Sequence, residues 1–195
     1  MTSIETPAAS ALTPEAADAG LAAAAQALRS HVRDVPDFPQ PGVVFKDITP
    51  LLATPAAFGA VIGALADTAE RLGATVVAGI EARGFLLAAP VADRIGAGIV
   101  PIRKQGKLPG RTVTESYALE YGTATLEMHA DAVGAGDRVL IIDDVLATGG
   151  TAAAAVNLLR HGGAEVLGLA VLMELTFLAG RTQIPSLNVT TLLSI

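Results

Sequence analysis

The stretch Val139-Leu140-Ile141-Ile142-Asp143-Asp144-Val145-Leu146-Ala147-Thr148-Gly149-Gly150-Thr151 carries the strongest structural pattern in this chain. Its aliphatic start predicts a buried strand over 138–142, and the Ala-rich residues after it predict a helix over 152–161. Two acidic residues and a Thr-Gly-Gly-Thr turn lie between these elements. Ligands of open α/β sheets bind outside the carboxyl ends of the strands, where this loop is expected, and the N–H groups that open a helix favour an anion. The stretch therefore predicts a phosphate site beside two carboxylates, which suits a phosphorylated sugar with a vicinal diol.

The composition is typical of one globular domain of the α/β class. The 195 residues are 51% hydrophobic and 16% charged, with no uninterrupted apolar run of membrane-spanning length and no cysteine. The N-terminus lacks the basic start and apolar core of a secretory signal. The absence of cysteine excludes disulfides and thiolate chemistry and fits a cytoplasmic location.

The charge balance argues against nucleic acid as a partner. The formal net charge is −6, whereas general nucleic-acid binding requires a basic face. Four of the 13 Lys and Arg residues nevertheless fall within nine positions, namely Arg103, Lys104, Lys107 and Arg111. This cluster is either a solvated loop or, as its neighbours in the sequence favour, a patch for a small polyanionic ligand.

Predicted strands and helices alternate along most of the chain, as expected for an α/β domain. Residues 1–19 predict a flexible extension, and residues 20–195 predict the domain. Proline-rich residues 35–41 end a first helix, and residues 43–45 resume an extended path. Helices are predicted over 21–32, 55–72, 84–95 and 152–161; strands over 75–80, 99–102, 138–142, 165–173 and 187–193; and a β-hairpin over 117–120 and 123–129.

Two common nucleotide-binding motifs are not present. The sequence contains no G-x-x-x-x-G-K-[ST], which excludes a P-loop nucleotidase. The pairs Gly96/Gly98 and Gly134/Gly136 lack a third glycine and precede strands, whereas the dinucleotide fingerprint follows one. We interpret both as turns between a helix and the next strand.

Five segments together resemble a known family. They are residues 37–48 (DFPQPGVVFKDI), 81–85 (EARGF), 103–110 (RKQGKLPG), 116–122 (SYALEYG) and 139–151 (VLIIDDVLATGGT). The last resembles the phosphoribosyl-pyrophosphate (PRPP) loop of type I phosphoribosyltransferases. All five, in order over residues 28–176, resemble the adenine phosphoribosyltransferases within that group. The resemblance implies a mainly parallel β-sheet flanked by helices, with an N-terminal hood over residues 33–50 and a flexible flap over residues 103–121.

The resemblance assigns the central stretch to the ribose and its phosphate. It implies that Asp143 and Asp144 engage the 2′- and 3′-hydroxyls of PRPP, with some help to a magnesium shell. Carboxylates accept hydroxyl hydrogen bonds and steady positive charge that grows on the sugar. The implied 5′-phosphate site comprises Ala147, Thr148, Gly149, Gly150 and Thr151. The alternative is that the acids only terminate a strand or cap the next helix, and that the loop is a structural turn.

A second group of residues is implied to bind pyrophosphate. It comprises Arg83 and Gly84 at one strand end and Arg103, Lys104 and Lys107 in the basic cluster. Arg binds pyrophosphate bidentately, and Gly84 permits close approach. In related enzymes the turn before Arg83 has a strained peptide geometry. The flap is implied to exclude water from a cation-like sugar.

Glu120 is implied to be the general acid/base that handles the purine ring proton, and Tyr121 is implied to close over the ligand. The alternative for Glu120 is a solvated charge. Glu127 is a second candidate for the proton transfer, although we assign it to the hairpin. The three histidines are scattered without metal-ligand spacing and receive no catalytic role.

The implied adenine site comprises Val44, Phe45, Lys46 and Val145. Phe45 stacks on one purine face with Val145 across the ring, while backbone groups near Val44 and Lys46 read the purine edge. Relatives usually carry Arg where Lys46 stands, which leaves open whether its side chain contributes. The alternative is that Val44 and Phe45 are core residues.

These features imply conversion of adenine and PRPP into AMP and diphosphate in purine salvage. Mg²⁺ is expected to be held mainly by PRPP, because no dedicated protein cage is visible in the sequence. The family implies a homodimer; no membrane partner is expected. The rivals are a phosphoribosyltransferase for xanthine, hypoxanthine or guanine, a nucleic-acid-binding regulator with the same fold, and an inactive relative.

Overall fold

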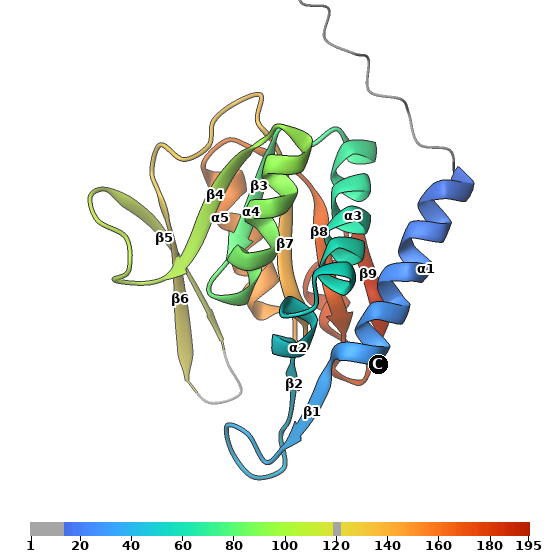
Figure 1. Ribbon diagram of the computed structural model, residues 1–195. Coiled ribbons are helices and arrows are strands. Elements are labelled where there is room, and N and C mark those ends of the chain that lie inside the picture. The colour runs from blue at the N-terminus through green and yellow to red at the C-terminus, as the bar shows by residue number, and fades with distance from the viewer. Residues whose placement is uncertain (1–13, 119–121) are drawn as a thin grey trace, which may run out of the picture.

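A computed structural model describes residues 14–118 and 122–195 (Figure 1). The elements are α1 (Pro14–His31), β1 (Arg33–Pro36), β2 (Val44–Asp47), α2 (Thr49–Leu52), α3 (Pro55–Leu72), β3 (Val76–Ile80), α4 (Arg83–Ile95), β4 (Gly98–Lys104), β5 (Thr112–Ala118), β6 (Thr123–His129), β7 (Arg138–Leu146), α5 (Gly150–His161), β8 (Glu165–Glu174), the 3-10 helices η1 (Thr176–Leu178) and η2 (Gly180–Gln183), and β9 (Val189–Ser194).

The central sheet confirms the predicted α/β class. Its strand order is β5-β6-β4-β3-β7-β8-β9, and the run from β4 to β9 is parallel. Strands β5 and β6 form an antiparallel hairpin at one edge, where β6 pairs with β4. Because β4, β3, β7 and β8 share one direction, their carboxyl ends lie at one edge of the sheet, which is where α/β ligand sites form.

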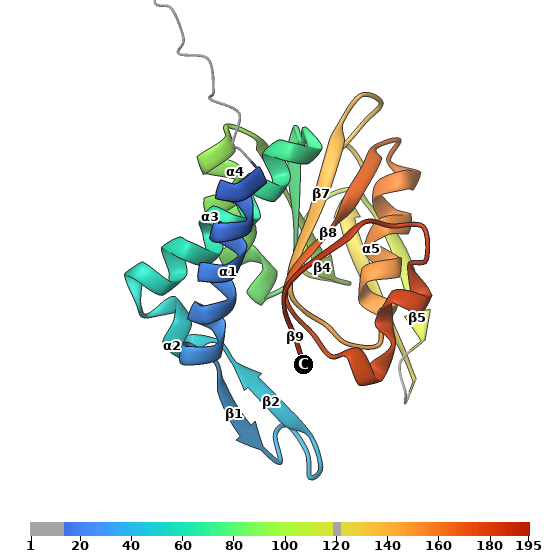
Figure 2. The same ribbon diagram turned by 90° about the vertical axis from the view of Figure 1, so that its right-hand side faces the viewer.

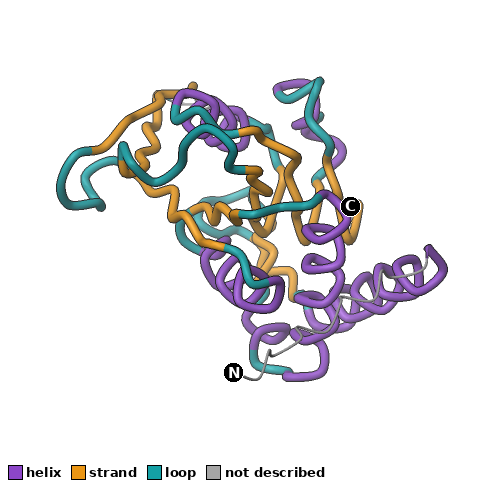
Figure 3. Tube along the Cα trace, turned by 90° about the horizontal axis from the view of Figure 1, so that it is seen from above, coloured by secondary structure: helices purple, strands orange, loops and turns teal. Residues whose placement is uncertain are grey.

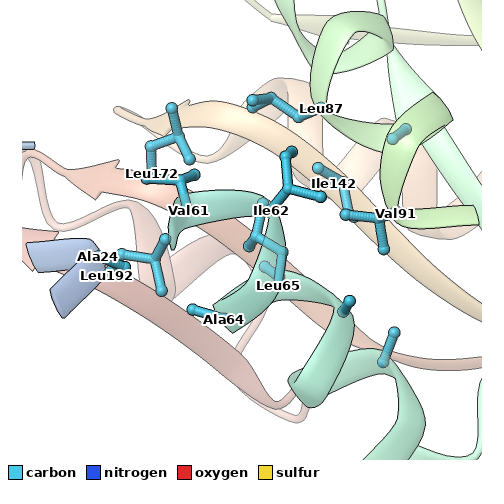
Figure 4. Close-up of a cluster of buried hydrophobic side chains, with 14 of the residues drawn as sticks. Ala24, Val61, Ile62, Ala64, Leu65, Leu87, Val91, Ile142, Leu172 and Leu192 are labelled. Atoms are coloured by element: carbon cyan, nitrogen blue, oxygen red, sulfur yellow. The ribbon is translucent and has the colours of Figure 1, made fainter. Parts of the chain in front are cut away.

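Helices cover both faces of the sheet, as Figures 2 and 3 show. Helices α1, α3 and α4 lie on one face and α5 on the other. Alternation along β7 explains both layers, since side chains of successive strand residues point to opposite faces. Leu140 and Ile142 join the core under α3 and α4, where Figure 4 labels Ile142, whereas Val139 and Ile141 join the core under α5.

Strand β7 is longer than predicted. It continues through the two acids to Leu146 because β8 pairs with it as far as Leu146 opposite Glu174. The prediction that Asp143 and Asp144 lie in a loop after the strand was therefore wrong. They are strand residues that come shortly before residues 147–151, the predicted phosphate site, which we call the phosphate loop.

Two further boundaries differ from the sequence-based prediction. Helix α1 begins at Pro14, so residues 14–19 are helical rather than part of a flexible extension. Proline fits the first helical position, and the alanines after it favour a helix. In the expected flap, residues 112–118 form the regular strand β5 because they pair with all of β6. The rest of the expected extension, residues 1–13, and the expected hairpin turn at residue 121 lie outside the described residues.

The antiparallel hairpin β1–β2 occupies the expected hood (Figure 1). It projects beyond the sheet at the end where β7 and β8 finish (Figures 1 and 2). Among residues 14–118 and 122–195, no helix has the combined length and hydrophobicity that crossing a membrane requires.

Candidate active site

The phosphate loop lines a cavity of about 80 Å³ at the carboxyl end of β7. Gly149 has a φ of +88°, a left-handed conformation that favours glycine, and helix α5 begins at the next residue. The loop thus presents the first N–H groups of α5, which have no partner within the helix. The cavity lining includes Asp143, Val145, Ala147, Thr148, Gly149 and Thr151. An acidic side chain and the phosphate loop therefore share one cavity.

A turn late in the chain supports the loop and was missed by the sequence analysis. A Cβ atom on Gly149 would lie 2.2 Å from Gly180 O, and one on Gly180 would lie 2.2 Å from Ala147 O. The two backbones therefore touch without a side chain between them. A Gly-Arg pair after a strand carries no functional signal in a single sequence.

Tyr117 on β5 also contacts the phosphate loop. Thr151 Oγ1 donates a hydrogen bond to the Tyr117 hydroxyl at 3.1 Å. Gly150 lies against the tyrosine ring, since a Cβ there would be 3.0 Å from Tyr117 Cδ2. Two residues earlier, Glu115 accepts a hydrogen bond from Asn157 Nδ2 at 2.8 Å. The hairpin β5–β6 is thus fastened to α5 next to the phosphate loop.

Asp143 and Asp144 have different partners because they are successive residues of a strand. Asp144 is buried, and its Oδ2 lies 2.7 Å from Arg83 Nη2 in an ion pair that lacks hydrogen-bond geometry. Asp143 lines the cavity, and its Oδ1 accepts the Asp144 N–H at 2.9 Å. Burial, followed by the neighbouring Asp144 charge, raises the pKa of Asp143 well above its usual value. Burial also raises the pKa of Asp144, although the Arg83 charge opposes this effect.

Arg83 connects the acids to the hood. Besides its ion pair with Asp144, Arg83 Nη1 donates to Lys46 O at 3.0 Å, and its guanidinium lies 4.6 Å from the centre of the Phe45 ring. Gly84 allows this approach, since a Cβ there would be 2.8 Å from Ile142 O. Arg83, from the expected pyrophosphate site, therefore forms one contact cluster with Phe45 and Lys46 of the expected adenine site. The peptide bond between Glu81 and Ala82 is cis.

The expected adenine residues of the hood differ in their exposure and in their partners. The Lys46 side chain pairs with Asp34 across the hairpin, with Nζ 2.7 Å from Oδ1, so only its carbonyl reaches Arg83. Val44 is about half exposed, and the Phe38 ring packs edge-on against Phe45 at 5.2 Å. The reading of Val44 as a core residue is wrong. Val145 lies on β7, where it lines the cavity.

Two glutamates hold the basic cluster. Glu81 accepts hydrogen bonds from Arg103 Nε at 3.2 Å and Lys104 N at 3.0 Å. Buried Glu127 on β6 accepts the backbone N–H groups of Lys107 and Leu108, each at 2.7 Å. The pKa of each carboxyl lies below its usual value. Burial alone would raise the pKa, but these hydrogen bonds favour the charged form and outweigh the effect of burial.

The position of Glu127 fits the expectation that it belongs to the hairpin. Its carboxylate accepts hydrogen bonds from the backbone N–H groups of residues 107 and 108, in the segment that carries the basic cluster. Arg103 adds a hydrogen bond from Nη1 to Lys107 O at 3.0 Å. Glu120 and Tyr121, the expected proton-transfer and flap residues, lie outside the described residues.

The described residues fit a metal ion only in a limited way. No three His, Cys, Asp or Glu side chains in residues 14–118 and 122–195 come together as a metal-binding group. The buried Oδ2 of Asp144, which makes no hydrogen bond, and the adjacent Asp143 are the oxygen donors that Mg²⁺ prefers. This donor set suits a magnesium ion that takes most of its ligands from a phosphorylated substrate.

Comparison with known proteins gives consistent matches. Residues 47–186 match the family model described as "Phosphoribosyl transferase domain". The chain is 75% identical over 175 residues to an adenine phosphoribosyltransferase of Parafrankia sp., covering 90% of this chain and 95% of that protein. The crystal structure of adenine phosphoribosyltransferase from Rhodothermus marinus is 51% identical with a TM-score of 0.85, covering 89% of this chain and 99% of that one. The Saccharomyces cerevisiae enzyme, crystallised with an imino-altritol bisphosphate and adenine, is 38% identical with a TM-score of 0.83, covering 88% and 99%.

Proposed function

This chain belongs to the phosphoribosyltransferase family, within it to the adenine phosphoribosyltransferases, and from that premise we propose which of its residues carry the reaction. The enzyme transfers the phosphoribosyl group of PRPP to adenine and releases diphosphate. A bond forms between N9 of adenine and the anomeric carbon. The bond from that carbon to the pyrophosphate oxygen breaks, and its electron pair leaves with pyrophosphate.

The phosphate loop is the proposed site for the 5′-phosphate. The observation that carries this assignment is the shared cavity, in which Asp143 lies beside the loop that opens α5. Unpaired N–H groups and the Thr148 and Thr151 hydroxyls supply donors for a phosphate. Asp143 and Asp144 then accept the ribose hydroxyls and stabilise the positive charge that develops on the ring. The raised pKa of each carboxyl indicates that ionisation costs free energy in the ligand-free site, which a cation-like sugar offsets.

Arg83 and the basic cluster are the proposed pyrophosphate site. The Arg83 guanidinium is a planar fork that matches phosphate oxygens, and Arg103, Lys104 and Lys107 add positive charge at the carboxyl end of β4. Pyrophosphate has to compete with Asp144 for Arg83 and with Glu81 for Arg103. Pyrophosphate therefore has to displace or share these ion pairs, and both arginines lie near the site proposed for the departing charge.

Phe45 is the proposed stacking residue for adenine, supported by the flat guanidinium that already lies over its ring. Val44, Lys46 and Val145 complete the proposed base site, with Lys46 acting through its backbone.

Glu120 is the proposed general acid/base for the adenine ring proton, and Tyr121 is the proposed cover over the ligand. Both assignments rest on the LEYG motif. Mg²⁺, held by PRPP with help from Asp143 and Asp144, would neutralise part of the pyrophosphate charge.

A homodimer in the cytoplasm is the proposed state of the enzyme. Leu86 on α4 and Ile99 on β4 are each about half exposed, which supports an apolar contact with a second copy. The cysteine-free composition supports a reducing compartment. The hood over residues 33–50 and the flap over residues 103–121 are the proposed covers of the base and of the reacting sugar.

A panel of bases tests the function directly. Adenine, hypoxanthine, guanine and xanthine are each supplied with PRPP and Mg²⁺, and pyrophosphate release is followed. We expect efficient turnover with adenine alone, because a mismatched exocyclic group leaves buried polar groups unpaired. A preference for a 6-oxo purine would overturn the base assignment and leave the phosphate site intact.

A further inference from the structure

The turn over residues 179–183, which we call the buttress turn, packs closely against the phosphate loop through backbone atoms. Each of the two contacts described above, between Gly149 and Gly180 O and between Gly180 and Ala147 O, leaves no room for a Cβ atom. Gln183 adds a third contact, since a Cβ on Gly149 would lie 3.0 Å from Gln183 Cβ. A displacement of the buttress turn therefore moves the phosphate loop or opens a gap behind it.

An ion pair fixes the position of the buttress turn. Arg181 Nε donates to Glu174 Oε1 and Arg181 Nη2 donates to Glu174 Oε2, both at 2.7 Å, in a bidentate arrangement. Glu174 is buried, and its Oε2 also accepts the Thr191 hydroxyl at 3.1 Å. Arg181 Nη1 donates to Val189 O at 3.3 Å. Two elements, β8 and β9, thus hold one guanidinium.

Glu174 connects the end of the central sheet to the buttress turn. It is the last residue of β8 and pairs with Leu146, the last residue of β7, which is followed directly by the phosphate loop. The Arg181 hydrogen bonds are the main cause of the lowered pKa of Glu174, so the carboxylate stays charged in a buried place. A buried charge of this kind costs free energy unless it is fully paired. No step of the proposed reaction uses it.

The phosphate loop needs support from outside itself. It contains two adjacent glycines, which make a chain flexible, yet phosphate binding requires its N–H groups to be held in a fixed arrangement. We propose that Arg181 is a positioning residue for the 5′-phosphate: through Glu174 and the buttress turn, it holds the phosphate loop in its binding conformation. This inference rests on the proposed assignment of residues 147–151 as the 5′-phosphate site.

Two variants test the inference by binding rather than by turnover. Arg181→Lys keeps the charge and loses the bidentate fork, whereas Gly180→Ala keeps both side chains of the ion pair and inserts a methyl group against Ala147 O. AMP and adenosine differ by the 5′-phosphate, so their affinities are measured by calorimetric titration. We expect each variant to bind AMP about 10- to 100-fold more weakly, the range for a displaced binding group, while adenosine binding changes less than twofold.

The matched control is Arg138→Lys. Arg138 pairs with Glu165 at the amino ends of β7 and β8, far along the same strands from the phosphate loop, with Nε 3.3 Å from Oε2. We expect this variant to bind both ligands as the wild type does. Thermal melting of all variants confirms that each is folded.

The outcomes separate the inference from the assignment beneath it. If AMP binds no better than adenosine to the wild type, the 5′-phosphate site itself is wrong. If the wild type prefers AMP but folded Arg181→Lys and Gly180→Ala keep that preference, the phosphate site stands and the positioning role is overturned. Equal losses for AMP and adenosine also overturn it, because they indicate general damage.

Discussion

The phosphate loop and the hood hairpin β1–β2 contribute to one candidate site but are held by different kinds of contact. The loop is packed backbone against backbone, with Gly149 against Gly180. The hairpin is joined to the sheet through side chains, chiefly Arg83, which reaches Phe45, Lys46 O and Asp144. Backbone packing leaves little freedom, whereas a side-chain cluster can exchange partners when a ligand enters.

This difference in contacts matches what the phosphate loop and the Arg83 cluster are each proposed to bind. The 5′-phosphate is the same group in PRPP and in AMP, so a rigid cradle serves both substrate and product. Pyrophosphate, by contrast, is part of PRPP but leaves as a separate product, so the groups that bind it must release it. We therefore expect substitutions at the phosphate loop to weaken the binding of both PRPP and AMP, and those at Arg83 to weaken the binding of PRPP alone.

The largest effect is expected from Gly149→Ala. The new methyl group meets Gly180 O and the residue keeps a φ of +88°, so we expect AMP and PRPP affinities to fall at least about 100-fold. Gly136→Ala is the control, because Gly136 has a φ of +96° but nothing within 4 Å of the added atom. Titration of both ligands into both variants gives the measurement. Near-wild-type AMP binding by Gly149→Ala would remove the idea of a rigid cradle.

The next largest effect is expected from Arg83→Lys. Lysine keeps the charge but loses the bidentate fork, so we expect PRPP affinity to fall about 10-fold while AMP affinity changes less than threefold. Arg94→Lys, at the other end of α4, is the matched control. The two titrations are made at one Mg²⁺ concentration. Equal losses for both ligands would contradict the assignment of Arg83 to pyrophosphate.

Asp143→Asn tests how much folding free energy is lost by keeping a buried carboxylate between the phosphate loop and Arg83. Burial raises its pKa, so the folded protein carries a penalty that is full above the raised pKa and vanishes below the usual value of 3.8. Removing the charge should therefore raise Tm at pH 7.5 by about 2–4 °C, which corresponds to about 1 kcal/mol in a domain of this size. The gain should shrink as pH falls towards 4, while turnover drops at neutral pH.

Asp93→Asn is the control for Asp143→Asn, since Asp93 is an exposed carboxylate on α4. It should leave Tm unchanged across the same pH range. A stabilisation by Asp143→Asn that is equal at pH 7.5 and pH 4.5 would show that charge is not its cause.

The order of the long helices and of the parallel strands could be predicted from the sequence because each depends on local pattern. The run of consecutive apolar residues at the start of β7 indicated a buried strand, and Thr54-Pro55 marked the start of α3. The end of β7 could not be predicted, since it is set by pairing with β8. Strand β5 was likewise hidden, because its residues are half polar and its partner is β6.

The candidate site was predicted where residues cluster in sequence and missed where they meet through the fold. The phosphate loop and its acids are contiguous, so their chemistry could be inferred. Tyr117 meets Thr151 across 34 positions, and Gly180 meets Ala147 only because η2 turns back. No local pattern signals a glycine that is needed for the close approach of two loops.

The smallest effect is expected from Lys46→Met, which addresses the question that the sequence left open. The Lys46 ammonium is paired with Asp34, and its carbonyl is the group that receives Arg83. An ion pair with an exposed partner contributes little, so we expect kcat/KM for adenine to change less than about twofold. Asp34→Asn, which removes the partner and keeps Lys46, should behave alike. A 10-fold loss confined to Lys46→Met would mean that the ammonium leaves Asp34 for the substrate, and the hood would then exchange partners at two side chains rather than at Arg83 alone.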